Sequence, residues 1–229
     1  MKTAVPPAPT FPQRGFTLTE MAVVLVIVAL LIGGMVLPMS AQQDIRSVSE
    51  TQKTLADITE ALYGFAASHS ASDGKPYLPC PDTNNDGLEN RDSNGVCVGS
   101  DGTTPQQDGT LPWATLGLGR QDAWGNTPRY AVAAAFSNST TGFTLLAAGD
   151  RRVCGEAACT TVLASTVPVV ILSRGKNGAA TPTNTDELQN TNGDANFVQR
   201  TPTSGFDDIV TWLPPSILIN RMISAGRLP

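Results

Sequence analysis

An apolar run that begins beside one acidic residue constrains this chain more than any other feature. The 17 residues from Met21 to Leu37 carry no charged or polar side chain, and Glu20 stands directly before them. Extending the segment back to Phe16 gives about 22 residues, enough to cross a hydrocarbon layer about 30 Å thick. The sequence therefore predicts a membrane-spanning helix, and the position of Glu20 at its edge needs an explanation.

An ordinary secretory signal peptide is the alternative reading of this run. Such a peptide has a short apolar stretch followed by a cleavage site of small residues. Here the first 15 residues contain Lys2 and Arg14 but no apolar core, so cleavage would fall near Ala41, beyond an unusually long run. Because positive residues stay on the cytoplasmic side, residues 38 onward are expected in the periplasm.

Composition argues against several classes of function. The net charge is −5 and no cluster of Lys and Arg occurs, so a nucleic-acid surface is not expected. His69 is the only histidine, which excludes multi-histidine metal and acid/base sites. The chain also lacks a complete dinucleotide loop, a Walker motif and a G-x-S-x-G nucleophile motif. We therefore expect no enzyme, and a membrane-anchored periplasmic enzyme is the less favoured alternative.

The cysteines point to an oxidising compartment. They include no C-x-x-C pair, so two disulfides are a simpler account than a zinc site or a thioredoxin-like centre. Catalytic dithiols usually sit two residues apart at a helix start, so the spacing in "CGEAAC" favours a structural, disulfide-closed turn over a redox role. The four residues concerned are Cys80, Cys97, Cys154 and Cys159.

The segment "RGFTLTE", which begins at Arg14, resembles the prepilin signal of type IV pilins and of the pseudopilins of type II secretion. Glycine, an aromatic residue, threonine, leucine and glutamate all have the family's spacing, although Thr19 stands where the family more often has an aliphatic residue. The resemblance implies that prepilin peptidase cleaves between Gly15 and Phe16, that Phe16 becomes N-methylated, and that Glu20 is the fifth mature residue.

The electrostatics of a membrane helix explain the presence of Glu20 independently of the resemblance. A carboxylate in a membrane helix normally needs a partner. Cleavage after Gly15 would create a cationic amine on Phe16, and attraction between opposite charges grows as the effective dielectric falls. Glu20 of one subunit can then pair with Phe16 of a neighbour and set the axial register of assembly. The alternative is that Glu20 merely sits at the headgroup boundary.

The apolar run continues into a second helical segment. A proline inside a helix removes one backbone hydrogen bond, so a kink is expected at Gly33, Gly34 and Pro38. Beyond it, Val48 and Leu62 belong to an apolar stripe with seven-residue spacing that one face of the head can cover.

These patterns predict an α+β, pilin-like fold in which a long N-terminal helix packs on an antiparallel sheet. Strands are expected at 129–136, 142–148 and 167–172, and a short helix from Pro215. The domains are then a leader at 1–15, a transmembrane or filament-core half-helix at 16–38, an amphipathic half-helix at 39–70 and a periplasmic head at 71–229. Within the head, 71–128 is expected to be a loop-rich insertion that Cys80 and Cys97 close.

Two acidic segments are candidate calcium sites. In "DTNNDG", oxygen ligands alternate at Asp82, Asn84 and Asp86, but an EF-hand would need glutamate where Ser93 stands, and a polar turn is the alternative. The segment "FDDIVTW" resembles the last strand of major pseudopilins and the acidic loop before it, which binds calcium in that family. This resemblance implies calcium ligation by the aspartates at 207 and 208, with a solvated pair at a strand start as the alternative.

The combined prediction is a structural subunit of a type IV pilus-like filament or a type II secretion pseudopilus. A minor subunit is favoured, with a filament-tip adhesin or substrate-recognition subunit as the alternative on the same scaffold. The expected partners are other pilin or pseudopilin subunits, prepilin peptidase, an inner-membrane assembly platform and membrane lipid, but no nucleic acid. A single-pass inner-membrane chain with a periplasmic head would become part of a filament. Pilus, secretion and DNA-uptake machines share this N-terminal chemistry, so the sequence does not separate them.

Overall fold

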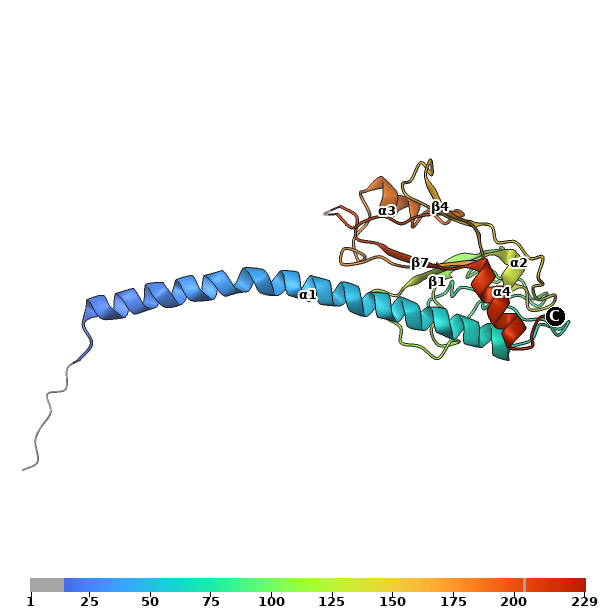
Figure 1. Cartoon of the computed structure of the whole chain (residues 1–229), viewed down its shortest axis with the longest axis horizontal. Coiled ribbons are helices and arrows are strands. Elements are labelled where there is room, and N and C mark those ends of the chain that lie inside the picture. Colours follow the sequence, from blue (N-terminus) through green and yellow to red (C-terminus); the bar gives the residue numbers. More distant parts are fainter. Residues whose placement is uncertain (1–14, 204) are drawn as a thin grey trace, which may run out of the picture. The chain divides into compact units, whose positions relative to one another are not determined.

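The computed structural model describes residues 15–203 and 205–229, without the side chains of residues 34–41. The chain divides into two compact units, Met1–Ile45 and Arg46–Pro229. Helix α1 (Leu18–Ser68) begins in the first unit and ends in the second (Figure 1). The predicted leader lies outside the described residues except for Gly15, so its processing is not tested.

The first unit contains the N-terminal part of α1. Its helical backbone continues through Gly33, Gly34 and Pro38, and the kink expected there stays a prediction. Among the described residues, no helix is both long enough and apolar enough to cross a membrane.

The second unit is built on two sheets (Figure 1). The first is antiparallel throughout, in the order β1 (Asp108–Thr110), β2 (Arg129–Val132), β5 (Val169–Ser173) and β7 (Ile209–Leu213). The second has the order β4 (Val162–Val167), β3 (Arg151–Cys154) and β6 (Asn196–Val198). In that sheet β3 runs antiparallel to β4 and parallel to β6. The helices besides α1 are α2 (Ala134–Ser137), α3 (Thr185–Gln189) and α4 (Pro215–Ser224).

Alternation along the strands gives the first sheet two buried faces. Tyr130 and Ile171 point toward α1 and share a core with Leu62 of that helix. Residues at the alternate positions of these strands point the other way and pack on the second sheet. Val170, for example, shares a core with Phe197. Successive side chains of a strand point to opposite faces, so the second unit has three layers: the C-terminal part of α1, the first sheet and the second sheet.

The structure confirms an α+β fold with an antiparallel sheet on the N-terminal helix and corrects all three expected strands. The expected strand at 129–136 ends at Val132, because the alanine-rich residues that follow form α2. The expected strand at 167–172 is β5, which begins at Val169 and ends at Ser173, because Val167 is the last residue of β4. The expected strand at 142–148 is absent. Instead Phe143 is buried and its N–H donates to the carbonyl of Pro76 at 2.9 Å, which ties this segment to a loop rather than to a sheet.

The C-terminal helix α4 begins at Pro215, as expected, and packs on α1. Leu218 and Met222 are buried in the core that also contains Leu62. Arg221 donates to both carboxylate oxygens of Glu60, at 3.0 and 2.9 Å. The amphipathic face of α4 therefore covers a part of α1 that the first sheet leaves open.

The four cysteines form the two expected disulfides. Cys80 pairs with Cys97, and both are fully buried in the core beside α1. Cys154 pairs with Cys159 at the end of β3. The first bond joins residues 17 apart in sequence and the second joins residues only 5 apart.

We expect the longer disulfide loop to contribute more stability, because cross-linking removes more chain entropy from the unfolded state as the loop grows. Replacing Cys80 and Cys97 by alanine should lower the free energy of unfolding by about 3 kcal/mol, against about 2 kcal/mol for Cys154 and Cys159. Urea unfolding of the two double variants measures the difference. Equal losses, or a larger loss for the 154–159 pair, would show that loop length does not decide the effect.

Candidate functional site

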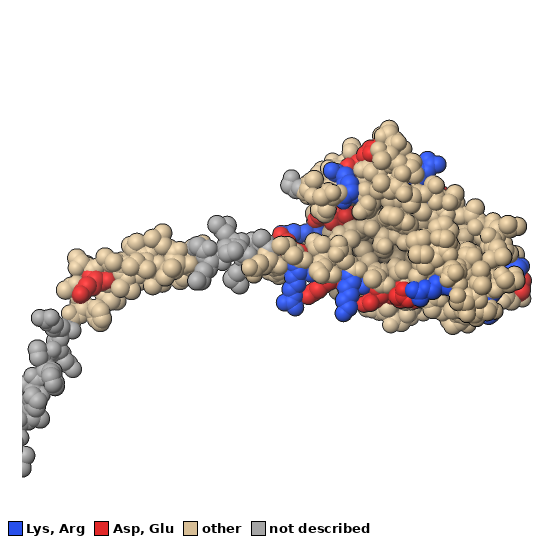
Figure 2. Space-filling view, viewed as in Figure 1, with Lys and Arg blue, Asp and Glu red and all other residues tan. Residues whose placement is uncertain are grey.

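The described residues of the first unit expose an apolar surface. Phe16 is 81% exposed and Leu18 is 87% exposed, and large apolar side chains remain at least 43% exposed as far as Ile32. Figure 2 shows this surface with one acidic patch on the face that is visible. Exposed apolar surface of this extent marks a site that contacts a membrane or another protein.

Glu20 is the only acidic residue in the first turn of α1, and its carboxylate caps that turn. Its Oε2 accepts hydrogen bonds from the N–H and from the Oγ1 hydroxyl of Thr17, both at 2.8 Å. In return, Thr17 Oγ1 accepts from the Glu20 N–H at 3.2 Å. This reciprocal arrangement is a capping box, which the spacing T-x-x-E could have predicted and which the sequence analysis overlooked.

The capping box bears on processing because it uses no atom before Thr17. Cleavage between Gly15 and Phe16 would leave both capping residues in the mature chain. Thr17 thus gives Glu20 a partner within its own chain, and the pairing of Glu20 with Phe16 of a neighbouring subunit stays a prediction. Such pairing would use the same carboxylate that caps the first turn of α1.

The first calcium candidate is an Asx-type turn in this structure. Asp82 is buried, and its Oδ1 accepts from the N–H groups of Asn84 and Asn85 at 3.1 and 2.6 Å. Its Oδ2 accepts from the N–H of Gly87 at 2.7 Å. Asn84 Nδ2 donates to Asp86 Oδ2 at 2.9 Å. The local backbone thus satisfies the carboxylate of Asp82, which supports the polar-turn alternative.

The second calcium candidate lies in a larger group of acids. Carboxylate oxygens of Glu187, Asp207 and Asp208 all lie within 4.8 Å of one another, and we call these three residues the acidic cluster. Glu187 comes from α3, twenty residues before Asp207, and the sequence analysis did not predict it. Because α3 and the start of β7 are brought together only by the fold, nothing local in the sequence indicates this partner.

Amide groups surround the acidic cluster. Asn190 Nδ2 donates to Asp208 Oδ2 at 2.7 Å, and the N–H of Asn177 donates to Asp207 Oδ2 at 3.0 Å. Asn177 also donates through Nδ2 to Glu187 Oε1 at 3.0 Å. Neutral donors of this kind orient carboxylates without neutralising them, so the mutual repulsion of the three acids remains.

Burial and repulsion shift the titration of the acidic cluster. Burial raises the pKa of Asp208 to about 7, with the carboxylates of Glu187 and Asp207 adding to the rise. Burial also raises the pKa of Asp207, although the N–H of Asn177 acts against it. A divalent cation or a retained proton would relieve this repulsion, and oxygen-rich clusters suit calcium.

The raised pKa of Asp208 predicts a stability change with pH in calcium-free buffer. The unfolded carboxyl titrates near pH 4, so the folded state retains the proton longer, and stability falls as the pH rises from about 4 to about 7. Asp208→Asn cannot ionise and keeps an acceptor for Asn190. The variant should therefore match the native chain near pH 4 and exceed its free energy of unfolding by about 4 kcal/mol above pH 7. Urea unfolding across this range would contradict the prediction if the difference did not grow with pH.

A hydrogen-bonded scaffold holds the loop against which Asp207 packs. Asn126 Nδ2 donates to the carbonyl of Gly175 at 2.7 Å, and the N–H of Gly175 donates to Ser173 Oγ at 3.1 Å. Gly175 has a φ of +60°, and a Cβ there would lie 2.4 Å from the carbonyl oxygen of Asp207. Only glycine allows this close approach, so the 173–177 loop fixes the backbone at the acidic cluster.

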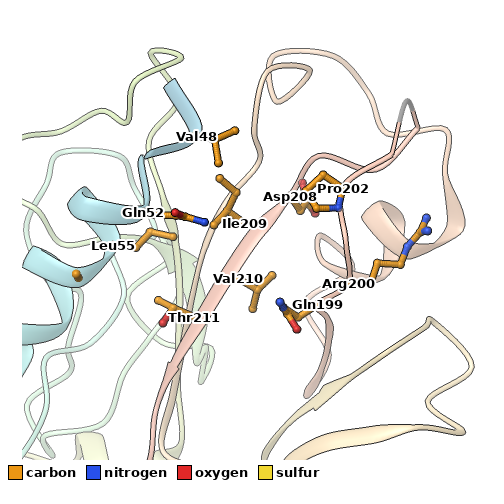
Figure 3. Close-up of a pocket in the computed structure, with 11 residues that line it drawn as sticks. Val48, Gln52, Leu55, Gln199, Arg200, Pro202, Asp208, Ile209, Val210 and Thr211 are labelled. Carbon is orange, nitrogen blue, oxygen red and sulfur yellow. The ribbon is translucent and has the colours of Figure 1, made fainter. Parts of the chain in front are cut away.

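A groove with a cavity volume of about 300 Å³ runs beside the acidic cluster (Figure 3). Val48 and Leu55 of α1 lie on the same side of the groove as Ile209 of β7, and Val210 of β7 points away from α1 toward Gln199. The segment 199–202 closes the far side. Asp208 belongs both to this groove and to the acidic cluster, so the groove brings the edge of the cluster to the surface of the second unit.

Comparison with known proteins bears on the N-terminal segment. A family model described as the prokaryotic N-terminal methylation motif matches residues 11–36. No curated protein and no solved structure matches the chain. The match includes the predicted cleavage position, the residue predicted to be methylated and Glu20. The chain therefore carries the N-terminal methylation motif that is the signal of type IV pilins and pseudopilins.

Proposed function

We propose that the chain is a minor structural subunit of a type IV pilus-like filament or a type II secretion pseudopilus. Prepilin peptidase cleaves it after Gly15, Phe16 is N-methylated, and the N-terminal part of α1 carries assembly. The methylation motif at residues 11–36 is the observation that supports this proposal. It indicates a structural subunit rather than an enzyme.

The surface of the first unit is consistent with this function. Apolar side chains from Phe16 to Ile32 are exposed, and burying them provides the driving force for anchoring and for assembly. Inner-membrane lipid covers them before assembly, and helices of other subunits cover them afterwards. The two disulfides of the second unit support a periplasmic location for the head.

The head supports a minor rather than a shaft-forming subunit. It adds a second sheet, a disulfide-closed insertion and the C-terminal helix α4 to the sheet that covers α1. Such additions occupy surface beyond that needed to cover the N-terminal helix. The partners are other pilin or pseudopilin subunits, prepilin peptidase and the inner-membrane assembly platform.

Recovery of the chain in isolated filaments tests this function. A tagged full-length chain, expressed in its own host, should co-purify with sheared filaments or a pelleted pseudopilus and be less abundant there than the main subunit. Scoring piliation, protein secretion and DNA uptake after gene deletion then identifies the machine. Recovery of the chain only as a monomer, while the host assembles its filaments normally, would contradict the proposal.

We further propose that the acidic cluster binds calcium. The cation would neutralise Glu187, Asp207 and Asp208, so added calcium should raise the melting temperature of the full chain. Asp208→Asn removes one anionic ligand and should reduce that rise. Asp82→Asn tests the other candidate loop and should leave the rise intact. An unchanged melting temperature for the native chain would eliminate both calcium candidates.

A further inference from the structure

A polar cavity of about 380 Å³ lies apart from the acidic cluster, where β1 of the first sheet faces the start of β3 in the second. Its lining residues are Pro105, Gln106, Gln107, Asp108, Arg151 and Gly193. None of them was predicted from the sequence. The chain meets here from three distant segments, so the cavity exists only in the folded head.

Asp108 is a buried carboxylate with incomplete hydrogen bonding. It is 7% exposed, and its Oδ2 accepts a hydrogen bond from Arg129 Nη2. Its Oδ1 is buried and has no hydrogen-bond partner among the described residues. A buried acceptor without a partner is unfavourable, so a donor that enters the cavity and bonds the Asp108 carboxylate would stabilise it.

Arg151 supplies hydrogen-bond donors to the same cavity. It is 6% exposed, its Nη2 donates to the carbonyl of Val132 at 2.9 Å, and its Nε makes no hydrogen bond. The ion pair from Nε to Asp150 Oδ1 spans 3.3 Å, and that aspartate is half-exposed. Because a guanidinium has five N–H groups, Arg151 retains donors for a ligand in the cavity.

The two glutamines offer one further acceptor and one further donor. Gln106 Nε2 donates to the carbonyl of Asp108 at 2.7 Å, which leaves its Oε1 as an acceptor. Gln107 Oε1 accepts from Ser137 Oγ at 3.3 Å, which leaves its Nε2 as a donor. The wall thus combines acceptors and donors instead of presenting one kind of group.

Charge narrows the class of ligand. Arg129 and Arg151 both act electrostatically on Asp108, so a cation would meet two guanidinium groups. An anion would meet the carboxylate of Asp108. A neutral group that donates and accepts at one atom avoids both penalties, and a hydroxyl group does so. Several adjacent hydroxyls would match the mixture of hydrogen-bond donors and acceptors that lines the cavity. The cavity volume is within the range of small-molecule sites.

We propose that this cavity binds a neutral polyhydroxy compound, a sugar ring, with one hydroxyl donating to the Asp108 carboxylate and accepting from the Arg151 guanidinium. The binding site lies wholly within the second unit and uses no residue of the assembly helix. It would give the head a ligand whether or not the N-terminal part of α1 is packed in a filament.

Saturation-transfer NMR on the full-length chain tests this site directly. The chain is kept in a detergent without a sugar headgroup and in buffer without glycerol, because either would compete. D-glucose, D-galactose and N-acetyl-D-glucosamine are the probes, with acetamide and sodium acetate as non-hydroxyl comparisons. We expect saturation transfer to the hydroxyl-bearing ring of at least one sugar and none to either comparison compound.

Matched variants assign the binding to the cavity. Asp108→Asn and Arg151→Lys should each weaken sugar binding about tenfold, the consequence of losing a charge-assisted hydrogen bond. Asp57→Asn and Arg152→Lys make the same chemical changes at exposed positions and should leave affinity unchanged. If Asp108→Asn fails to fold, Arg151→Lys against Arg152→Lys decides alone. No sugar binding by the native chain, stronger binding of acetamide or acetate, or equal affinity in the cavity and control variants would each overturn the proposal.

Discussion

Glu20→Ala is expected to abolish incorporation of the chain into filaments. The carboxylate stands at the start of an exposed apolar helix, where burial against lipid or other helices lowers the local dielectric. A cationic amine on Phe16 of a neighbouring subunit would then be attracted far more strongly than in water. Losing that pairing should reduce the chain in sheared filaments at least about tenfold, measured by immunoblot.

Two further substitutions separate charge pairing from helix capping. Glu20→Gln keeps the capping box, because glutamine serves at the same position, but removes the charge. Thr17→Ala removes the cap and keeps the charge. We expect Glu20→Gln to fail as severely as Glu20→Ala, and Thr17→Ala to retain most incorporation. Glu50→Ala, at an exposed acid of the same helix, is the control. Normal incorporation of Glu20→Gln would show that capping, not charge, is what assembly requires.

Asp122→Ala should cause the largest loss of stability in the head. Asp122 is 7% exposed, and its Oδ1 accepts from the N–H groups of Trp124 and Asn126 at 3.0 and 2.9 Å. Its Oδ2 accepts from Ser173 Oγ at 2.5 Å. Alanine would leave three donors without a partner, of which the Ser173 hydroxyl is buried and the two N–H groups are half-buried. We therefore expect a loss of about 5 kcal/mol and a fall in melting temperature of roughly 15 °C.

Asp101→Ala is a closely matched control for this substitution. The carboxylate of Asp101 also accepts from two backbone N–H groups, of Thr103 and Thr104, and from one hydroxyl. It is exposed, so water can replace the lost hydrogen bonds and the melting temperature should hardly change. Calorimetry of both variants measures the contrast. Similar melting temperatures for the two would show that burial of Asp122 does not set the effect.

Asp122 also bears on the acidic cluster. Its hydrogen bonds hold Asn126 and Ser173, which in turn hold the loop packed against Asp207. Asp122 begins the segment "DAWGN". The structure gives it a physical role, because a buried carboxylate organises the turn that positions a candidate ligand.

Features encoded by local sequence could be predicted. The long helix, the short disulfide around "GEAA" and the start of α4 at Pro215 each depend on residues close together in the chain. The methylation motif is also local, and the family model matches it. The capping box had a local signal too, the spacing from Thr17 to Glu20, but it was overlooked.

Features that depend on distant pairing could not be predicted. The second sheet joins β3 to β6, two short strands about 45 residues apart, and most residues of β4 are not buried, so no apolar alternation marks it. Glu187 joins the acidic cluster, and Arg151 approaches Asp108, only because that sheet packs on the first. Both candidate sites of the head, the acidic cluster and the polar cavity, therefore depend on the second sheet, which was not predicted from the sequence.

Mass spectrometry of the mature N-terminus tests the central claim most directly. The full-length chain should be expressed in a host that contains prepilin peptidase, and its N-terminal peptide should be sequenced. A processed pilin-like subunit must begin with N-methylated Phe16 and lack residues 1–15. A mature chain that begins at Met1, or one cut near Ala41 as a secretory signal peptide would be, would contradict the claim.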